Sequence, residues 1–487
     1  MELEFYVDAY GAAGDGVTND AYAINAAVNA AKEAPPEAVK HIIFSCEKTY
    51  RITEVPENNR LNCLFCLDRT ENISIEGKGA KLLFSGKNKL AFVTNSRNFR
   101  IEGFVIDYSP KPFIISELIS FSSENRTMEF KAQEDIGIDG QSFTPDTLWF
   151  IFPNRSDIRY HYFIERFESL GDNRYLLTVN SNTANRIAEA RAGDEFLLPN
   201  INGSHQAGAM CTIMDCDSFY CGYLRFYCLP EFGFDIRMNK GVMRFENIAF
   251  KPCENAREKL VSWRDGFHIK DNTEPIIWEK CYIGPLGDDA FNISCVHLDV
   301  TYAGEDRKTV WAFPAEKGKT RDLIEGDAFV AYALDSGKLI GEGRVSEVIP
   351  SENDVRFVSD TELPGLEKGM QISFYRFANP GFTVKNSYIE GTVRVRGSGT
   401  FENCSFNVFW VRIENEYFVE GPVPKDITFE NCEFTTPYDS DAEIFHVGTL
   451  SRIGSDCEYK CKNIVLDGCR FIKGTWHADE GNELTVK

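Results

Sequence analysis

The sequence predicts an all-β chain folded as a right-handed parallel β-helix, a solenoid that carries an N-terminal capping helix and two inserted antiparallel β-barrel domains. Three observations support this fold class. Eight short segments share a pattern of alternating apolar and polar residues, which is typical of strands with one buried face. The chain has 38 Phe and 19 Tyr, and aromatic residues favour strands. Two long segments that lack the pattern resemble each other, which indicates related inserts.

The N-terminal stretch predicts a cap. A Gly-rich turn, GAAGDG, precedes an Ala-rich segment, and we expect a helix from about Asn19 to Ala34 because alanine is the best helix former. The open end of a solenoid exposes the apolar interior of its first coil, so a helix at this position would cover it.

The eight repeated segments predict the coils. They close on Glu-Gly, Glu-Asn or Asn-Cys and resume with an apolar residue, and they are NISIEG (72–77), NFRIEG (98–103), VMRFEN (242–247), IIWEKC (276–281), FTVKNS (382–387), FENCSF (401–406), ITFENC (427–432) and IVLDGC (464–469). Asparagine tolerates left-handed backbone, so the turns at Asn247, Asn386, Asn403 and Asn431 are expected to adopt it. Their amides could also stack from coil to coil.

Residues 108–200 and 297–378 are the predicted barrels. SELISFSSEN in the first echoes SEVIPSEN in the second, and GDEFLL echoes GDAFVA. The parallel β-helix would then comprise residues 1–107, 201–296 and 379–487. The second insert leaves the helix shortly after Asp289, so we expect it to wall the functional site.

Three aspartates are the candidate catalytic residues. Asp265 precedes the pair Asp288 and Asp289 by 23 residues, which is about one coil of a solenoid. The carboxylates would therefore gather on neighbouring coils of a rigid sheet, as the cleavage of a glycosidic bond requires. Gly287 would allow the backbone to bend so that both members of the pair reach solvent. The alternative is that both motifs are ordinary acidic turns.

Polar and aromatic residues near these aspartates are candidates for substrate binding: Trp263, Arg264, His268, Asn292, Arg394 and Arg396. Trp263 and Arg264 could stack on a sugar and hydrogen-bond to it, or merely pack. His268 would point to the opposite face of a straight strand from the first aspartate, so a structural role is as plausible as a binding role. Arg394 and Arg396 share one face and could equally be surface residues in salt bridges.

Composition excludes several classes of protein. A formal charge of −22 argues against nucleic acid and anionic membranes as partners. The sequence contains no run of about 18 apolar residues, so no membrane-spanning helix is expected. The chain has 15 Cys but a single CxxC, Cys63 to Cys66, so neither a zinc site nor another metal or cofactor is expected. Free thiols and the lack of a recognisable signal peptide favour a cytoplasmic protein, or a secreted or periplasmic one if an export signal precedes this sequence. The barrels could provide surfaces for a homodimer.

Specific motifs carry a resemblance to a known family. GAAGDGVTND with its helix looks like the first coil of the pectate-lyase-like β-helix superfamily. DGFHIKDN followed by GDDAFNI resembles the active-site coils of glycoside hydrolase family 110, and DYSPKPF leading into the first insert fits that family too. The resemblance implies an exo-acting α-1,3-galactosidase that releases terminal α-linked galactose, with Asp265, Asp288 and Asp289 as catalytic residues, inversion of configuration and no metal requirement.

Other functions stay open. Polygalacturonases of family 28 share the paired aspartates, but this sequence has no Gly-His-Gly, and RVRG replaces their Arg-x-Lys. A polysaccharide lyase could hold Ca²⁺ on the three aspartates with Arg396 as its base, and a β-helix can also bind glycans without catalysis. Branched blood-group B type glycans, linear α-1,3-digalactosides and algal galactans are equally compatible with these residues.

The resemblance and the residue types suggest roles for the aspartates. Asp288 is expected to be the general acid, because neighbouring negative charge raises the pKa of one member of such a cluster. Asp265 and Asp289 would activate the attacking water. Inversion predicts that acid and base carboxyls lie about 6.5–9.5 Å apart.

Overall fold

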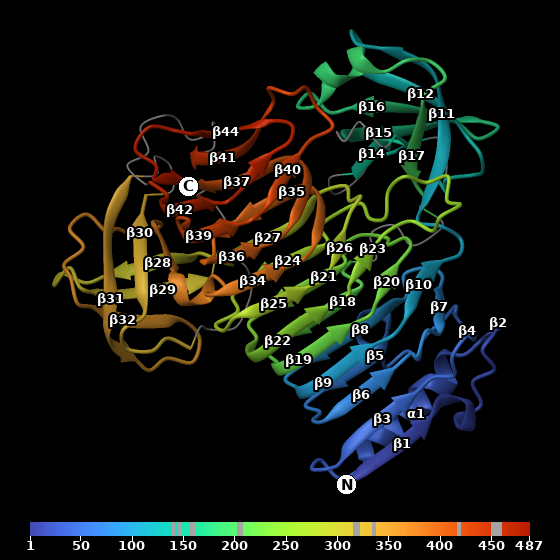
Figure 1. Cartoon of the computed structure of the whole chain (residues 1–487), viewed down its shortest axis with the longest axis horizontal. Coiled ribbons are helices and arrows are strands. Elements are labelled where there is room, and N and C mark those ends of the chain that lie inside the picture. Colours follow the sequence, from blue (N-terminus) through green and yellow to red (C-terminus); the bar gives the residue numbers. More distant parts are fainter. Residues whose placement is uncertain are drawn as a thin grey trace.

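The computed structural model describes residues 1–138, 142–144, 149–155, 161–201, 208–314, 322–333, 338–415, 420–449 and 460–487. It is a three-sided parallel β-helix from which two closed antiparallel barrels project, so the predicted fold class is confirmed. The coils stack from the N-terminal end, blue in Figure 1, toward the C-terminal strands in red. No helix among the described residues is long and apolar enough to cross a membrane.

The first side of the helix is a parallel sheet of twelve strands. In stacking order these are β1 (Glu2–Tyr6), β3 (Val39–Ile43), β6 (Ile73–Glu76), β9 (Arg97–Glu102), β19 (Asp217–Gly222), β22 (Lys240–Glu246), β25 (Ile276–Glu279), β34 (Phe382–Lys385), β36 (Gly399–Glu402), β39 (Lys425–Glu430), β42 (Lys462–Asp467) and β45 (Leu484–Val486). Each of the eight repeated segments contributes a strand to this side.

The other two sides share one larger sheet. The second side stacks β2 (Asp15–Asn19), β4 (Thr49–Ile52), β7 (Lys81–Phe84), β10 (Val105–Tyr108), β20 (Arg225–Phe226), β23 (Ala249–Phe250), β26 (Tyr282–Ile283), β35 (Tyr388–Val395), β37 (Ser405–Asn415), β40 (Glu433–Thr435) and β43 (Arg470–Phe471). The third stacks β5 (Cys63–Asp68), β8 (Lys89–Thr94), β18 (Cys211–Met214), β21 (Phe234–Arg237), β24 (Phe267–Lys270), β27 (Asp289–Val296), β41 (Glu443–Thr449) and β44 (Thr475–Ala478), with β35 and β37 continuing from the second side between β27 and β41.

The repeated Asn and Gly residues make the corner between the first two sides. Asn247, Asn386, Asn403 and Asn431 all have φ between 50° and 53°, so the predicted left-handed turns are confirmed. Amide stacking is found at a different corner, which joins the third side to the next coil. There Asn239 Nδ2 donates to Asn272 Oδ1 at 2.9 Å, and Asn272 Nδ2 donates to Asn379 Oδ1 at 2.6 Å.

Stacked phenylalanines fill the interior. Residues in register on successive coils lie about one strand spacing, 4.7–4.9 Å, apart, so identical rings can stack. Phe234, Phe267 and Phe291 form one such column, with ring centroids 5.0 and 5.2 Å apart. The abundance of Phe thus follows from the repeat of the coil.

The N-terminal helix α1 (Ala21–Glu33) covers the first coil, as predicted. Its buried face includes Ile24, Ala27, Val28 and Ala31, and it packs against β1, β3 and β5. Asp20 precedes the helix, and its Oδ1 accepts a hydrogen bond from the Ala13 amide at 2.6 Å. The Gly-rich turn is thereby tied to the start of the helix.

The two inserts are six-stranded barrels with their own cores. The first consists of β11 (Phe113–Ser122), β12 (Thr127–Ala132), β14 (Trp149–Pro153), β15 (Tyr162–Gly171), β16 (Arg174–Val179) and β17 (Glu195–Pro199), with β13 (Ser142–Phe143) paired to β15. The second consists of β28 (Leu298–Ala303), β29 (Thr309–Pro314), β30 (Ala328–Tyr332), β31 (Leu339–Ile349), β32 (Val355–Ser359) and β33 (Gln371–Phe374). In Figure 1 the first barrel is teal and the second barrel is gold, and they project from different parts of the β-helix.

Candidate active site

Strand register brings the three aspartates together. Phe267 of β24 pairs with Phe291 of β27, which puts Asp265 in register with Asp289, and the Gly266 amide donates to the Asp289 carbonyl at 2.9 Å. Asp265 therefore stacks on Asp289 at the same corner of neighbouring coils. Asp288 lies one residue earlier, at the end of the turn that leads into β27.

One carboxylate oxygen from each of the three aspartates lies within 4.8 Å of the others. The side chains of Asp265 and Asp289 are 4% and 5% exposed, whereas that of Asp288 is 30% exposed. Asp288 is therefore the carboxyl that a molecule entering from solvent would meet. The separation of about 6.5–9.5 Å expected between the acid and base carboxyl groups of an inverting glycosidase stays a prediction, because 4.8 Å bounds only the distances between single oxygen atoms.

Gly287 is required for space. A Cβ at this position would lie 2.4 Å from the carbonyl oxygen of Trp263 and 2.6 Å from Cζ of Phe152. The turn that carries Asp288 thus presses directly on the coil below and on the first barrel.

Arginines partly balance the aspartates. Arg264 Nε lies 3.3 Å from Asp288 Oδ2, and Arg394 Nε lies 3.3 Å from Asp289 Oδ2. Thr392 Oγ1 also donates to Asp289 Oδ1. Three carboxylates with two guanidinium groups leave an excess of negative charge, which favours retention of a proton.

The pKa values follow from this environment. Burial, and then the charge of Asp289, raises the pKa of Asp265 to about 8. Burial also raises the pKa of Asp288 well above its usual range, and the charges of Asp265 and Asp289 add to the effect. The cluster therefore holds at least one proton near neutral pH, as a general acid requires.

His268 lies beside the cluster. Its Nδ1 is 2.8 Å from Asp265 Oδ2, although a straight strand would have placed the two on opposite faces. Asp265 precedes β24 and lies in the turn, so strand alternation does not apply to it. Burial, and then Lys270, lowers the pKa of His268 to about 3, so the imidazole is neutral and orients the carboxyl.

A buried charge network begins at Lys270, two residues after His268 on β24. Lys270 Nζ is 2.6 Å from Glu420 Oε1, and Arg396 Nη1 is 2.8 Å from Glu420 Oε2. Burial alone would raise the pKa of Glu420, but these two cations hold it well below its usual range. Asn292 Nδ2 donates to Glu420 Oε1 at 3.1 Å, so Asn292 and Arg396 belong to this network.

Asp288 and Asp289 open into a cavity of about 820 Å³. The first barrel forms one wall with Phe150, Phe152, His161, Phe163 and Arg186, and the later coils form another with Phe409, Trp410 and Tyr438. Burial, and then Arg186, lowers the pKa of His161 to about 3, so this wall presents a neutral imidazole among aromatic rings.

The expectation that the second barrel walls the site is wrong: no described residue of that barrel lines the cavity. The chain leaves for the second barrel after Val296, at the far end of β27 from Asp289. It leaves for the first barrel after β10, and β10 stacks in line with β20, β23 and β26. The turn after β26 carries Asp288, so the first barrel emerges at the corner that bears the catalytic candidates.

The predicted binding residues divide into two groups. Arg264 and Arg394 line the cavity. Trp263 is only 1% exposed and packs on Phe113 and Phe152, with ring centroids 5.7 and 5.2 Å apart, so it anchors the first barrel instead of stacking on a sugar. His268, Asn292 and Arg396 are absent from the lining and contact the residues behind it.

Sequence reasoning missed the aromatic walls and Glu420. The runs WFIFP (149–153) and HYF (161–163) supply Phe150, Phe152, His161 and Phe163, and their aromatic density was an available signal. No pattern marked Glu420, because the network that holds it brings together residues 150 positions apart in the chain.

The fold and the site define a parallel β-helix protein with an acidic, aromatic-walled pocket. No family model and no curated protein matches the sequence. Among solved structures, the surface adhesin PfbA of Streptococcus pneumoniae aligns over 99% of this chain and 81% of its own, at 11% identity and a TM-score of 0.40.

Two glycoside hydrolases also align with the chain. The catalytic unit of a GH87 α-1,3-glucanase from Streptomyces thermodiastaticus covers 99% of this chain and 67% of its own, at 10% identity and a TM-score of 0.40. A family 28 exopolygalacturonase from Yersinia enterocolitica covers 100% and 78%, at 11% identity and a TM-score of 0.38.

Proposed function

We propose that this protein is a glycoside hydrolase and that its substrate is a glycan with a terminal α-linked galactose. The observation that carries the class of reaction is the cluster of Asp265, Asp288 and Asp289, of which Asp288 and Asp289 line a cavity, with at least one proton retained near neutral pH. Glycosidic cleavage needs one carboxylic acid and one carboxylate on a rigid frame, and this cluster supplies both. The galactose specificity rests on the resemblance of DGFHIKDN and GDDAFNI to family 110.

The shape of the cavity supports action at a chain end. A volume of about 820 Å³ is within the range of about 300–1,000 Å³ for sites that enclose a small ligand. Phe152 and its neighbours bound the cavity on one side, and Trp410 bounds it on another. Aromatic rings can pack on the apolar face of a sugar, while Arg264 and Arg394 can donate hydrogen bonds to its hydroxyl groups.

The exposure of Asp288 supports its role in the proposed mechanism. Asp288, the exposed member, donates its proton to the glycosidic oxygen. Asp289, which receives a hydrogen bond from Thr392 and pairs with Arg394, deprotonates the water that attacks the anomeric carbon, and Asp265 holds that water. A single displacement of this kind inverts configuration, so an α-galactoside would give β-galactose. The stereochemistry of the product is therefore the direct test of this step.

The activity is tested by a screen of α-galactosyl oligosaccharides that differ in linkage, with Asp288→Asn as the control. We expect galactose release from α-1,3-linked substrates by the wild type and none by the variant. Proton NMR of the fresh product reports its anomer, and initial α-galactose would contradict the single displacement. Turnover of other glycans alone would retain the hydrolase and remove the galactose specificity, while glycan binding without turnover would leave a binding protein.

A lyase is a second candidate, because the same three carboxylates lie at distances that a metal ion could bridge. A lyase of this fold would use Ca²⁺ on Asp265, Asp288 and Asp289 and would leave an unsaturated uronide. EDTA treatment separates the two functions. Full activity in EDTA without an ultraviolet-absorbing product supports the hydrolase, whereas loss of activity and its recovery with Ca²⁺ support the lyase.

A further inference from the structure

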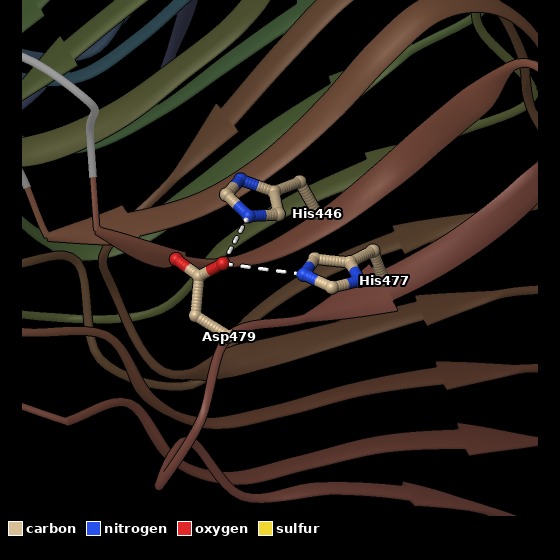
Figure 2. A group of neighbouring side chains, drawn as sticks. All are labelled: His446, His477 and Asp479. Atoms are coloured by element: carbon tan, nitrogen blue, oxygen red, sulfur yellow. Dashed lines mark hydrogen bonds and ion pairs between the residues drawn. The ribbon is translucent and has the colours of Figure 1, made fainter. Parts of the chain in front are cut away.

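A second group of ionisable side chains converges on the last two coils, outside the candidate active site. His446 of β41 pairs in register with His477 of β44, and their rings stack with centroids 5.6 Å apart and planes 14° apart. Asp479 turns its carboxylate toward both rings, as Figure 2 shows. Its Oδ1 lies 3.3 Å from His446 Nε2 and 3.2 Å from His477 Nε2.

These atoms are spaced as metal ligands are. A tetrahedral zinc ion with bonds of about 2.0–2.1 Å holds neighbouring ligand atoms about 3.3 Å apart. Both nitrogen–oxygen distances match that value, and all three ligand atoms lie within 4.8 Å of one another. A charge-assisted N–H···O hydrogen bond would be shorter, at about 2.7–2.9 Å. The spacing therefore accommodates a cation between the groups as well as it accommodates the two hydrogen bonds.

The surrounding residues prepare the ligands. Glu414 Oε1 lies 2.8 Å from His446 Nδ1, so it can hold the proton on Nδ1 and leave the Nε2 lone pair for a metal. The Asp479 amide donates to the Val447 carbonyl at 2.9 Å, which fixes the backbone of the third ligand. A Cβ at Gly448 would lie 2.1 Å from Asp479 Oδ2, so the carboxylate occupies room that only glycine leaves.

We propose that His446 Nε2, His477 Nε2 and Asp479 Oδ1 bind a Zn²⁺ ion, with water at the remaining coordination position. Two imidazoles favour a transition metal, because Ca²⁺ and Mg²⁺ take oxygen ligands. The side chains of His477 and Asp479 are 51% and 37% exposed, so an ion can enter from solvent. This site is separate from the three aspartates and does not depend on the proposed glycosidase activity.

The position of the site indicates its role. His446 pairs with Arg412, which pairs with Arg394 of the cavity wall, so the ion would lie roughly 10 Å from Arg394 along the helix axis. Among the described strands, β44 pairs with β41 alone. Zn²⁺ would join the last coil to the preceding one and so stabilise the C-terminal end of the helix.

The test is metal binding by the full chain after chelator treatment. We expect one Zn²⁺ per chain by elemental analysis after dialysis against micromolar Zn²⁺, and a higher Tm with Zn²⁺ than without it. His477→Ala and Asp479→Asn should each lose both the ion and the Tm increase. Glu414→Gln should raise the Kd for Zn²⁺ by about 10–100-fold, the usual effect of losing a residue that orients a ligand.

A histidine near the N-terminal end of the β-helix offers a matched control substitution. His41 Nδ1 is 2.6 Å from Glu76 Oε1, which is a contact between one imidazole and one carboxylate at hydrogen-bond distance. His41→Ala should therefore bind Zn²⁺ as the wild type does. All measurements use a Cys46→Ser background, because Cys46 is an exposed thiol that could bind zinc.

Two results would overturn the proposal. The first is the absence of stoichiometric Zn²⁺ in the parent protein. The second is wild-type Zn²⁺ binding by both His477→Ala and Asp479→Asn, because the ion would then be held elsewhere.

Discussion

Replacement of Asp265 by Asn tests the electrostatics of the candidate active site without a substrate. Asp265 is buried, and its pKa of about 8 lies far above the value of about 3.9 for an unfolded chain. Asparagine keeps the shape of the side chain and a hydrogen bond to His268 but cannot titrate. The variant therefore isolates the free energy with which the fold holds this proton.

The magnitude follows from the linkage between proton binding and folding. A carboxyl whose folded pKa is raised contributes stability that is fully present below the unfolded pKa and is lost as pH rises through the folded pKa. Between about pH 4 and pH 8 the folded state holds one more proton than the unfolded state, which corresponds to about 1.4 kcal/mol per pH unit. Relative to the wild type, Asp265→Asn should thus gain about 3–4 kcal/mol of stability between pH 5 and pH 8.

Urea unfolding of both proteins at several pH values measures this difference. Infrared difference spectra of wild type minus variant give an independent readout, because a protonated carboxyl band should persist at pH 7 and disappear above pH 8. Asp306→Asn is the control, since hydrogen bonds from Thr309 lower the pKa of Asp306 and its contribution is constant over this range. A stability difference between Asp265→Asn and wild type that does not change from pH 5 to pH 8, with no carboxyl band, would refute the reasoning.

Three further substitutions probe the site. Asp288→Asn should lower kcat by a factor on the order of 10²–10⁴, the usual contribution of a general acid, without lowering Tm; turnover close to that of the wild type would remove the acid role. Gly287→Ala places a methyl group 2.4 Å from the Trp263 carbonyl, so both Tm and turnover should fall, and an unchanged protein would show that the turn can move. Glu420→Gln leaves two buried cations without their carboxylate and should destabilise the fold by about 3–5 kcal/mol in urea unfolding; a loss below about 1 kcal/mol would mean that water or other groups compensate the charges.

The coil was predictable because its signal is local and repeated. The turn residues at Asn247, Asn386, Asn403 and Asn431 each meet the same backbone requirement, so the pattern recurs along the sequence. The grouping of Asp265 with Asp288 and Asp289 followed from the length of one coil. These features depend on the repeat and not on the details of packing.

The walls of the pocket were not predictable in the same way. Which barrel reaches the site depends on the corner of the coil from which the chain departs. This corner is defined by the stacking of β10 in line with β20, β23 and β26. The burial of Trp263 depends on contacts with Phe113 and Phe152, which lie more than a hundred positions earlier in the chain. Such long-range contacts leave no local pattern in the sequence.

The junction of the first barrel has a consequence for the evolution of specificity. Phe113, where the barrel begins, pairs with Pro199, where its last strand ends, so the two connections to the helix lie side by side. A short loop could replace the whole domain without changing the path of the coils, and the aspartates would keep their places because they belong to the helix. Loss of this one module would remove the wall that contains Phe150, Phe152, His161 and Phe163 and would open the cavity, so under the proposed activity it would favour cleavage within a chain over cleavage at its end.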